Sequence, residues 1–205
     1  FWWYCKRIFP EYVKFRVVRK KSMYKEVFGF SVWVGYGAIA TVGKSQGAAV
    51  IVNMFFNTVM NTALGLANSV NSILLTFANN VTKSIAPQIV KSYSAGDFKR
   101  SEDLVIMSSK VSFLIMLLVS SPFLIAPELL FNIWLDSVPD HVVVFTTLII
   151  IDALIGTLNA GIPELIFATG KIRNYQVILN TVFLLSVFAA FFVLKTGVPA
   201  FYLLV

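Results

Sequence analysis

Polar side chains recur along one face of a segment that is otherwise largely apolar. The set comprises Asn61, Asn68, Asn71, Ser72, Asn79 and Lys83. At 100° per residue of an α-helix, all but Asn71 fall within about 60° of one another, and Asn71 and Thr82 flank them. Amides that face lipid would leave hydrogen-bonding atoms unsatisfied, so this face is expected to point into a helix bundle or a wet cavity. The alternative is that these side chains join neighbouring helices, with Lys83 snorkelling to a membrane surface.

Asp152 is a second candidate, because it lies well inside an apolar segment. A carboxylate within a membrane span costs about 2.5–3.5 kcal/mol on insertion scales and indicates a functional site by default. Helical spacing places Asn159 and Pro163 on the same face as Asp152, with Glu164 about 120° away. Asp152 and Asn159 therefore serve either proton or ion coupling or an interhelical hydrogen bond. The expected partner of Asp152 is Lys83 or one of the asparagines.

The elements that must position these residues are membrane-spanning helices. The chain is 58% hydrophobic and 13% charged, with a mean hydropathy of +0.79, whereas a soluble globular chain has about 45–50% and about 25%. Five apolar stretches satisfy the requirement of about 20 residues for a helix that crosses a bilayer. These predicted spans are 27–43 with a possible continuation through 48–56, then 63–89, 104–126 with a kink at Pro122, 141–168 and 176–194. Residues 1–5 resemble the interfacial end of an earlier span, and 201–205 the start of a sixth.

Basic residues are confined to alternate connections between these spans. Fourteen of the 17 Lys and Arg residues lie in 6–25, 91–110 and 171–173, whereas the other connections carry only Lys44 and Lys195. Because basic residues near span ends are held on the cytoplasmic side, we predict that 6–26, 91–103 and 169–175 lie inside. Residues 57–62, 127–140 and 195–199 then lie outside. Residues 6–26 are expected to form a basic linker with an amphipathic helix, whose apolar side carries Tyr12, Phe15, Val18 and Tyr24.

Several familiar motifs fail on spacing or context. Gly43-Lys44-Ser45 resembles the end of a phosphate-binding loop, but Ala38 stands where its first glycine should be. The single histidine, His141, and the single cysteine, Cys5, predict neither a metal site nor a disulfide framework. The glycines at 29, 35 and 37 are expected to allow close helix packing. We therefore expect no enzyme activity, no cofactor, no metal and no nucleic-acid partner.

Short stretches along residues 20–200 resemble bacterial polysaccharide and lipopolysaccharide biosynthesis membrane proteins, the Wzx-like flippases of the MATE-like (MOP) superfamily. These stretches are Asn53-Met54-Phe55-Phe56-Asn57, Asn61-Thr62-Ala63-Leu64-Gly65-Leu66-Ala67, Ala86-Pro87-Gln88-Ile89-Val90-Lys91-Ser92-Tyr93 with Ala95-Gly96-Asp97, and Phe167-Ala168-Thr169-Gly170-Lys171 with Tyr175. The resemblance implies an all-α integral membrane fold in which two helical lobes rock around a central cavity. Residues 1–26 then include the interlobe linker, and 27–205 form most of the C-terminal lobe.

The same resemblance implies a function and a set of partners. The expected activity is the flipping of oligosaccharide linked to polyprenyl diphosphate across the bacterial inner membrane, for lipopolysaccharide, O-antigen or capsule synthesis. The polar face at 61–83 would then line the substrate cavity, with amides for the sugar and Lys83 for charge. The expected partners are membrane lipid, the lipid-linked oligosaccharide, an N-terminal lobe of the same chain, and glycan polymerase or ligase proteins. A multidrug or cation antiporter of the same fold, which Asp152 favours, and a non-transporting scaffold for glycan assembly are the alternatives.

Overall fold

A computed structural model describes residues 2–8, 20–55 and 58–195, and every regular element in these ranges is an α-helix. The helices are α1 (Trp2–Ile8), α2 (Lys21–Phe55), α3 (Thr58–Ser94), α4 (Phe98–Ile125), α5 (Pro127–Trp134), α6 (Val142–Thr157), α7 (Ile162–Thr169) and α8 (Arg173–Lys195). The all-α prediction is therefore confirmed for the described residues. Most of the predicted amphipathic linker, including Tyr12, Phe15 and Val18, lies outside them, and so does the expected start of a sixth span.

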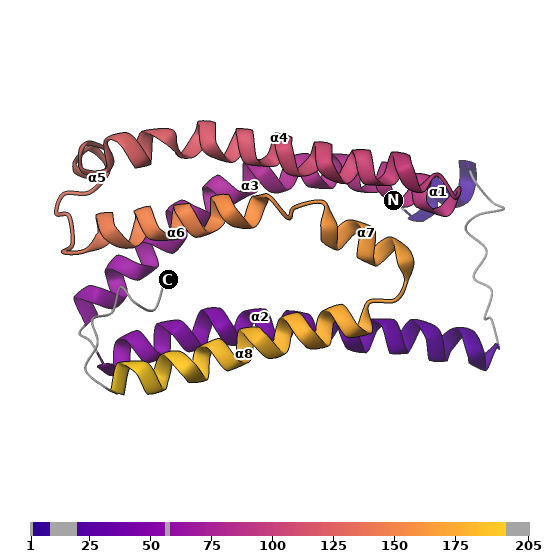
Figure 1. Cartoon of the computed structure of the whole chain (residues 1–205), viewed down its shortest axis with the longest axis horizontal. Helices are drawn as coiled ribbons and strands as arrows, with labels where there is room; N and C mark the ends of the chain where they lie inside the picture. The colour runs from indigo at the N-terminus through magenta and orange to yellow at the C-terminus, as the bar shows by residue number, and fades with distance from the viewer. Residues whose placement is uncertain (1, 9–19, 56–57, 196–205) are drawn as a thin grey trace.

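The long helices form two layers that run along the same axis (Figure 1). Helices α3, α4 and α6 pack against one another as a three-helix bundle, and α7 continues this layer against α3. Helices α2 and α8 pair side by side to form the second layer, which contacts the bundle through α3. The two layers are thus well packed internally and less extensively joined to each other.

Helix direction alternates, so alternate connections meet at the same end of the molecule. Figure 1 shows that the beginning of α2, the α3–α4 connection and the α7–α8 turn lie together at one end. We call this the basic end, because it carries Lys25, Lys91, Lys99, Lys171 and Arg173. The opposite end carries the acidic connection around α5. The predicted segregation of basic connections is therefore confirmed, while the assignment of the basic end to the cytoplasm stays a prediction.

Three of the helices, α2, α4 and α8, are long and apolar enough to cross a membrane, and the bent pair α6–α7 makes a fourth if it counts as one span. Their outward surfaces are rich in large apolar side chains, for example Leu114 and Leu118 on α4 and Phe188 and Phe192 on α8. A soluble chain rarely leaves so much apolar surface open to water, so these faces suit lipid. The first predicted span continues without a break through the apolar stretch at 48–55 as part of α2.

The second predicted span differs from the expectation in composition. Helix α3 is 37 residues long, which is ample for a bilayer, but it is not among the helices apolar enough to count as a span. Its amides and hydroxyls lower its hydropathy, and it buries one face against α4 and α6. The prediction that all five stretches are mostly apolar spans is therefore wrong for this helix. Its polar groups suit contact with protein neighbours better than contact with lipid.

The fourth predicted span, 141–168, is not one continuous helix. Helix α6 ends at Thr157, α7 begins at Ile162, and the two axes differ by 45°. Pro163 lies in the first turn of α7, where its missing N–H is tolerated, and it has no N–H to donate to the carbonyl of Asn159, which favours a new helix start here. Gly161 packs against α4 so closely that an added Cβ would lie 2.9 Å from the carbonyl oxygen of Val105.

A row of serines forms the seam between α4 and α3. Ser101, Ser108, Ser112 and Ser120 are buried at intervals of seven, four and eight residues on one face of α4. The hydroxyl of Ser112 lies 3.2 Å from the Thr82 hydroxyl and donates to the carbonyl of Ala78 at 3.3 Å. Small side chains allow helix backbones to approach closely. The Ser112 hydroxyl joins the two helices, whereas those of Ser101 and Ser120 donate to the carbonyls of Asp97 and Leu117.

Replacing Ser112 by Ala is expected to lower the free energy of unfolding by about 0.6 kcal/mol, the average for interhelical hydrogen bonds in membranes. The fully buried site keeps its small volume, so the loss reports the two hydrogen bonds alone. Thermal unfolding of the purified protein in detergent measures it. Ser84→Ala is the control, because Ser84 is exposed and bonds only within its own helix. Equal losses in the two variants would show that the seam does not depend on these bonds.

Helix α2 packs on α8 through glycine, as predicted, but only one of the expected glycines contributes. A Cβ on Gly37 would clash with the side-chain amide of Gln176, which in turn accepts a hydrogen bond of 2.6 Å from the buried amide of Asn180. Gly29 and Gly35 have open space where a Cβ would lie, so the prediction of close packing is wrong for them.

Candidate functional site between the two helix layers

A pocket of about 440 Å³ lies where α2 and α8 face α3 and α6. We call it the interlayer pocket. Its polar lining comprises Lys44 of α2, Asn71, Asn79 and Thr82 of α3, and Asp152 and Thr157 of α6. The rest of the wall is apolar and includes Leu75 of α3 and Phe183 of α8. Four helices that are distant in sequence thus contribute side chains to one hollow.

Two opposite charges face this pocket from different layers. Asp152 comes from the three-helix bundle and Lys44 from the α2–α8 pair, and both side chains are exposed. Within the described residues neither has an ion-pair partner, and the Lys44 ammonium lies over the Phe183 ring, 4.6 Å from its centroid. A cation–π contact of this kind stabilises the ammonium less than a carboxylate does at close range. Both charges therefore remain available to a ligand or to each other.

Asn71 adds an unsatisfied hydrogen-bond acceptor. Its residue is partly buried, and its Oδ1 atom is shielded from solvent without a hydrogen-bond partner among the described residues. A buried amide oxygen without a donor costs free energy and calls for an explanation. Because this oxygen has no contact with solvent, a bound molecule can donate to it only if the side chain or the neighbouring helices move. Asn79 lines the same wall two helical turns further along α3, and its side chain is exposed.

The predicted polar face of α3 is divided by the structure. Asn71 and Asn79 reach the pocket, whereas Asn68, Ser72 and Lys83 are exposed on α3 but do not line it, and Asn61 is partly buried near the start of the helix. Thr82 also reaches the pocket wall, yet its hydroxyl is buried against Ser112 of α4, so its main role is structural. The flank of the predicted stripe, with Asn71 and Thr82, therefore faces the pocket, and Asn79 is the residue of the central stripe that also reaches it.

The predicted partner of Asp152 is only partly correct. The structure brings Asp152 to the same pocket as Asn71 and Asn79, as expected of the asparagines, but Lys83 does not share that pocket. Lys44 does. The prediction that Lys44 lies in a connection is wrong, because α2 is continuous from Lys21 to Phe55. Its isolation within a long apolar stretch was the signal that could have found it.

Asn159 was predicted to share a helix face with Asp152, and this prediction is wrong. Asn159 lies in the break between α6 and α7, where its N–H donates to the carbonyl of Gly156 at 3.1 Å. A shared face requires 100° per residue through 152–163, and the bent break between Thr157 and Ile162 ends that regularity. Asn159 is exposed and is not part of the pocket lining.

Comparison of the chain with models of protein families, with curated proteins and with solved structures finds no match. Among the described residues, no group of three or more His, Cys, Asp or Glu side chains could hold a metal ion. The chemistry of the interlayer pocket therefore consists of amides, hydroxyls, one ammonium and one carboxylate. Such groups bind and orient polar molecules by hydrogen bonds and charge.

Proposed function

We propose that this chain is one lobe of a membrane transporter that flips polyprenyl-diphosphate-linked oligosaccharide across the bacterial inner membrane. The observation that carries the proposal is the interlayer pocket, a hollow between helices of a membrane-type bundle that presents Asn71, Asn79, Asp152 and Lys44. Polar and ionisable groups are expensive inside a membrane and are retained where they meet a substrate or a wet cavity. The resemblance to Wzx-like flippases of the MATE-like superfamily supplies the class of substrate and the two-lobe architecture.

The pocket chemistry suits a substrate with a sugar head and a phosphate link. Asn71 and Asn79 line the pocket, where the exposed amide of Asn79 can bond to sugar hydroxyls directly and the shielded Oδ1 of Asn71 can do so once it is uncovered. Lys44 offers an ammonium to a diphosphate. The polyprenyl chain can remain in lipid, alongside the exposed apolar rows of α4 and α8. Alternating access around a site between helix layers would move the head while the tail stays in the bilayer.

A multidrug or cation antiporter of the same fold is the second candidate, because Asp152 offers a carboxylate to a cation from the same pocket. A scaffold without transport activity is the third, in which the amides of α3 would bind a partner helix. The three candidates differ in what the amides contact. They bind sugar in a flippase, they are secondary to Asp152 in an antiporter, and they hold a protein in a scaffold.

Complementation of a bacterial strain that lacks its oligosaccharide flippase tests the proposal. The full-length parent gene is expected to restore surface glycan without conferring drug resistance. Asn71→Ala/Asn79→Ala is expected to reduce the restored glycan about tenfold, because two lost amide contacts of about 0.5–1.5 kcal/mol each amount to roughly that factor. The readout is surface polysaccharide at equal membrane abundance of the protein.

The matched control is Asn68→Ala/Ser72→Ala, which removes one amide and one hydroxyl from the same helix outside the pocket. It is expected to keep wild-type rescue. Drug resistance without glycan would support the antiporter instead. Loss of recovered glycan-assembly complexes in the Asn71/Asn79 variant, with no transport by any form, would support the scaffold.

A further inference from the structure

A second hollow lies at the basic end, away from the interlayer pocket. It has a volume of about 1090 Å³ and lies between the beginning of α2 and the turn that joins α7 to α8. We call it the turn pocket. Among the described residues that line it, three are cationic, Lys25, Lys171 and Arg173, and none is Asp or Glu. A concave site with this charge and no internal carboxylate is suited to an anion.

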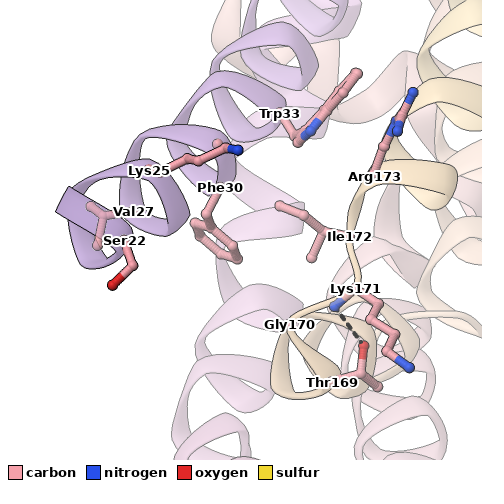
Figure 2. A pocket seen from close by; sticks show the side chains of 11 residues that line it. Ser22, Lys25, Val27, Phe30, Trp33, Thr169, Gly170, Lys171, Ile172 and Arg173 are labelled. Atoms are coloured by element: carbon pink, nitrogen blue, oxygen red, sulfur yellow. Dashed lines mark hydrogen bonds between the residues drawn. The ribbon is translucent and has the colours of Figure 1, made fainter.

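Arg173 is held in place by an aromatic ring. Its guanidinium lies over Trp33 of α2, 5.3 Å from the ring centroid. Stacking leaves the edge of a guanidinium free to donate hydrogen bonds, and that edge matches the geometry of phosphate oxygens. Figure 2 shows Lys25 and Arg173 approaching the region beside Trp33 from two sides, whereas the Lys171 ammonium points the other way. Lys25 and Arg173 are therefore the two cations that lie on the Trp33 side of the turn pocket.

The backbone of the turn between α7 and α8 also favours an anion in this pocket. Gly170 adopts a left-handed conformation, with φ of 70°, and ends α7, while the 23-residue helix α8 begins at Arg173. The first N–H groups of a helix have no intrahelical partner, and the helix dipole places partial positive charge there. Thr169 stabilises the turn by accepting a hydrogen bond of 3.1 Å from the Lys171 N–H. Ile172 is buried and fixes the turn against the protein, so Arg173 projects from a defined position.

The position of the turn pocket indicates which anion it meets. Trp33, Phe30 and Ile172 give it an apolar wall, and the cations lie at the end of the molecule where the basic connections gather. Aromatic and basic residues occur together at the level of lipid headgroups. A water-soluble anion has no need of the apolar wall, whereas a lipid phosphate presents charge and hydrocarbon together.

We infer that the turn pocket binds the phosphate of a membrane lipid, with Lys25 and Arg173 as its ligands. The same chemistry occurs in an anionic phospholipid headgroup and in a polyprenyl diphosphate, so both lipids are tested. The inference requires only the membrane setting of the helices, and it does not depend on transport through the interlayer pocket.

Native mass spectrometry of the purified full-length protein in neutral detergent, titrated with phosphatidylglycerol or with phosphatidylcholine, tests this site. The wild type is expected to bind phosphatidylglycerol at least about tenfold more tightly, since each Lys or Arg at an anionic surface contributes about 1 kcal/mol. Lys25→Gln/Arg173→Gln is expected to lose that preference. Lys99→Gln/Arg100→Gln, which removes the same charge from the same end outside the turn pocket, is expected to retain it.

The second arm replaces phosphatidylglycerol by polyprenyl diphosphate. A preference for the diphosphate that is lost only in Lys25→Gln/Arg173→Gln also supports the site and assigns it to the substrate. Equal losses in the two double variants, or no preference over phosphatidylcholine for either anion, would overturn the inference. The single variant Lys25→Gln changes an exposed side chain and keeps the test decisive if the double variant does not fold. Failure of glycan rescue with intact lipid binding would count against the proposed transport alone.

Discussion

Asp152→Asn is expected to abolish transport by the full-length protein while its abundance in the membrane stays unchanged. The substitution keeps the size and shape of the side chain and removes only the charge. Asp152 is exposed to the interlayer pocket and has no ion-pair partner among the described residues, so the fold does not depend on its carboxylate. If the carboxylate couples transport or pairs with Lys44 when the helix layers close, its loss removes a charge interaction that the neutral amide cannot replace.

We expect transport to fall by at least about 100-fold, because a desolvated charge interaction of about 3 kcal/mol corresponds to that factor. Uptake or flipping assays in proteoliposomes at matched protein content measure it. Asp136→Asn is the control, since it makes the same chemical change in an exposed position of the connection after α5. Wild-type transport by Asp152→Asn would show that the carboxylate is not part of the mechanism. Recovery of activity in Lys44→Asp/Asp152→Lys would show that the two charges act as a pair.

Gly161→Ala is expected to destabilise the folded protein by about 1–3 kcal/mol, the usual cost of inserting a methyl group into a packed site. The new Cβ would lie 2.9 Å from the carbonyl oxygen of Val105 and 3.0 Å from its Cα. Both are backbone atoms of α4, so they cannot move aside as a flexible side chain can. Gly161 has an ordinary φ of −84°, and the cost therefore comes from contact rather than from backbone strain.

Thermal unfolding in detergent is expected to show a lower transition temperature for Gly161→Ala. Gly65→Ala is the matched control, because nothing lies within 4 Å of the Cβ it would add on α3. Alanine is a better helix former than glycine by up to about 1 kcal/mol, so the control is expected to be neutral or more stable. Equal stability of the two variants would mean that close packing of the start of α7 against α4 does not stabilise the protein. Because the α6–α7 break also borders the interlayer pocket, reduced transport by Gly161→Ala is expected as well.

Local properties of the sequence were sufficient for the overall character of this protein. Apolar stretches of bilayer length predicted an all-α membrane fold, and alternate basic connections predicted the common basic end. Both depend on composition and order along the chain, which folding does not alter. The choice of Asp152, Asn71 and Asn79 as site residues rested on the same reasoning, since a polar group in an apolar helix requires a polar neighbour. The break at Gly161 and Pro163 was also visible locally, although the fourth span was predicted to be continuous.

The tertiary structure alone decided which of these groups meet. Packing of α3 against α4 and α6, with Ser112 and Thr82 in contact between them, leaves Asn71 and Asn79 lining the interlayer pocket, whereas Asn68 does not reach it. Packing of α2 on α8 through Gly37 brings Lys44 to the same pocket as Asp152. No spacing in the sequence could predict that these two residues meet there. A helical wheel defines the angles between side chains on one helix, but the direction in which the helix faces depends on the shapes of its neighbours.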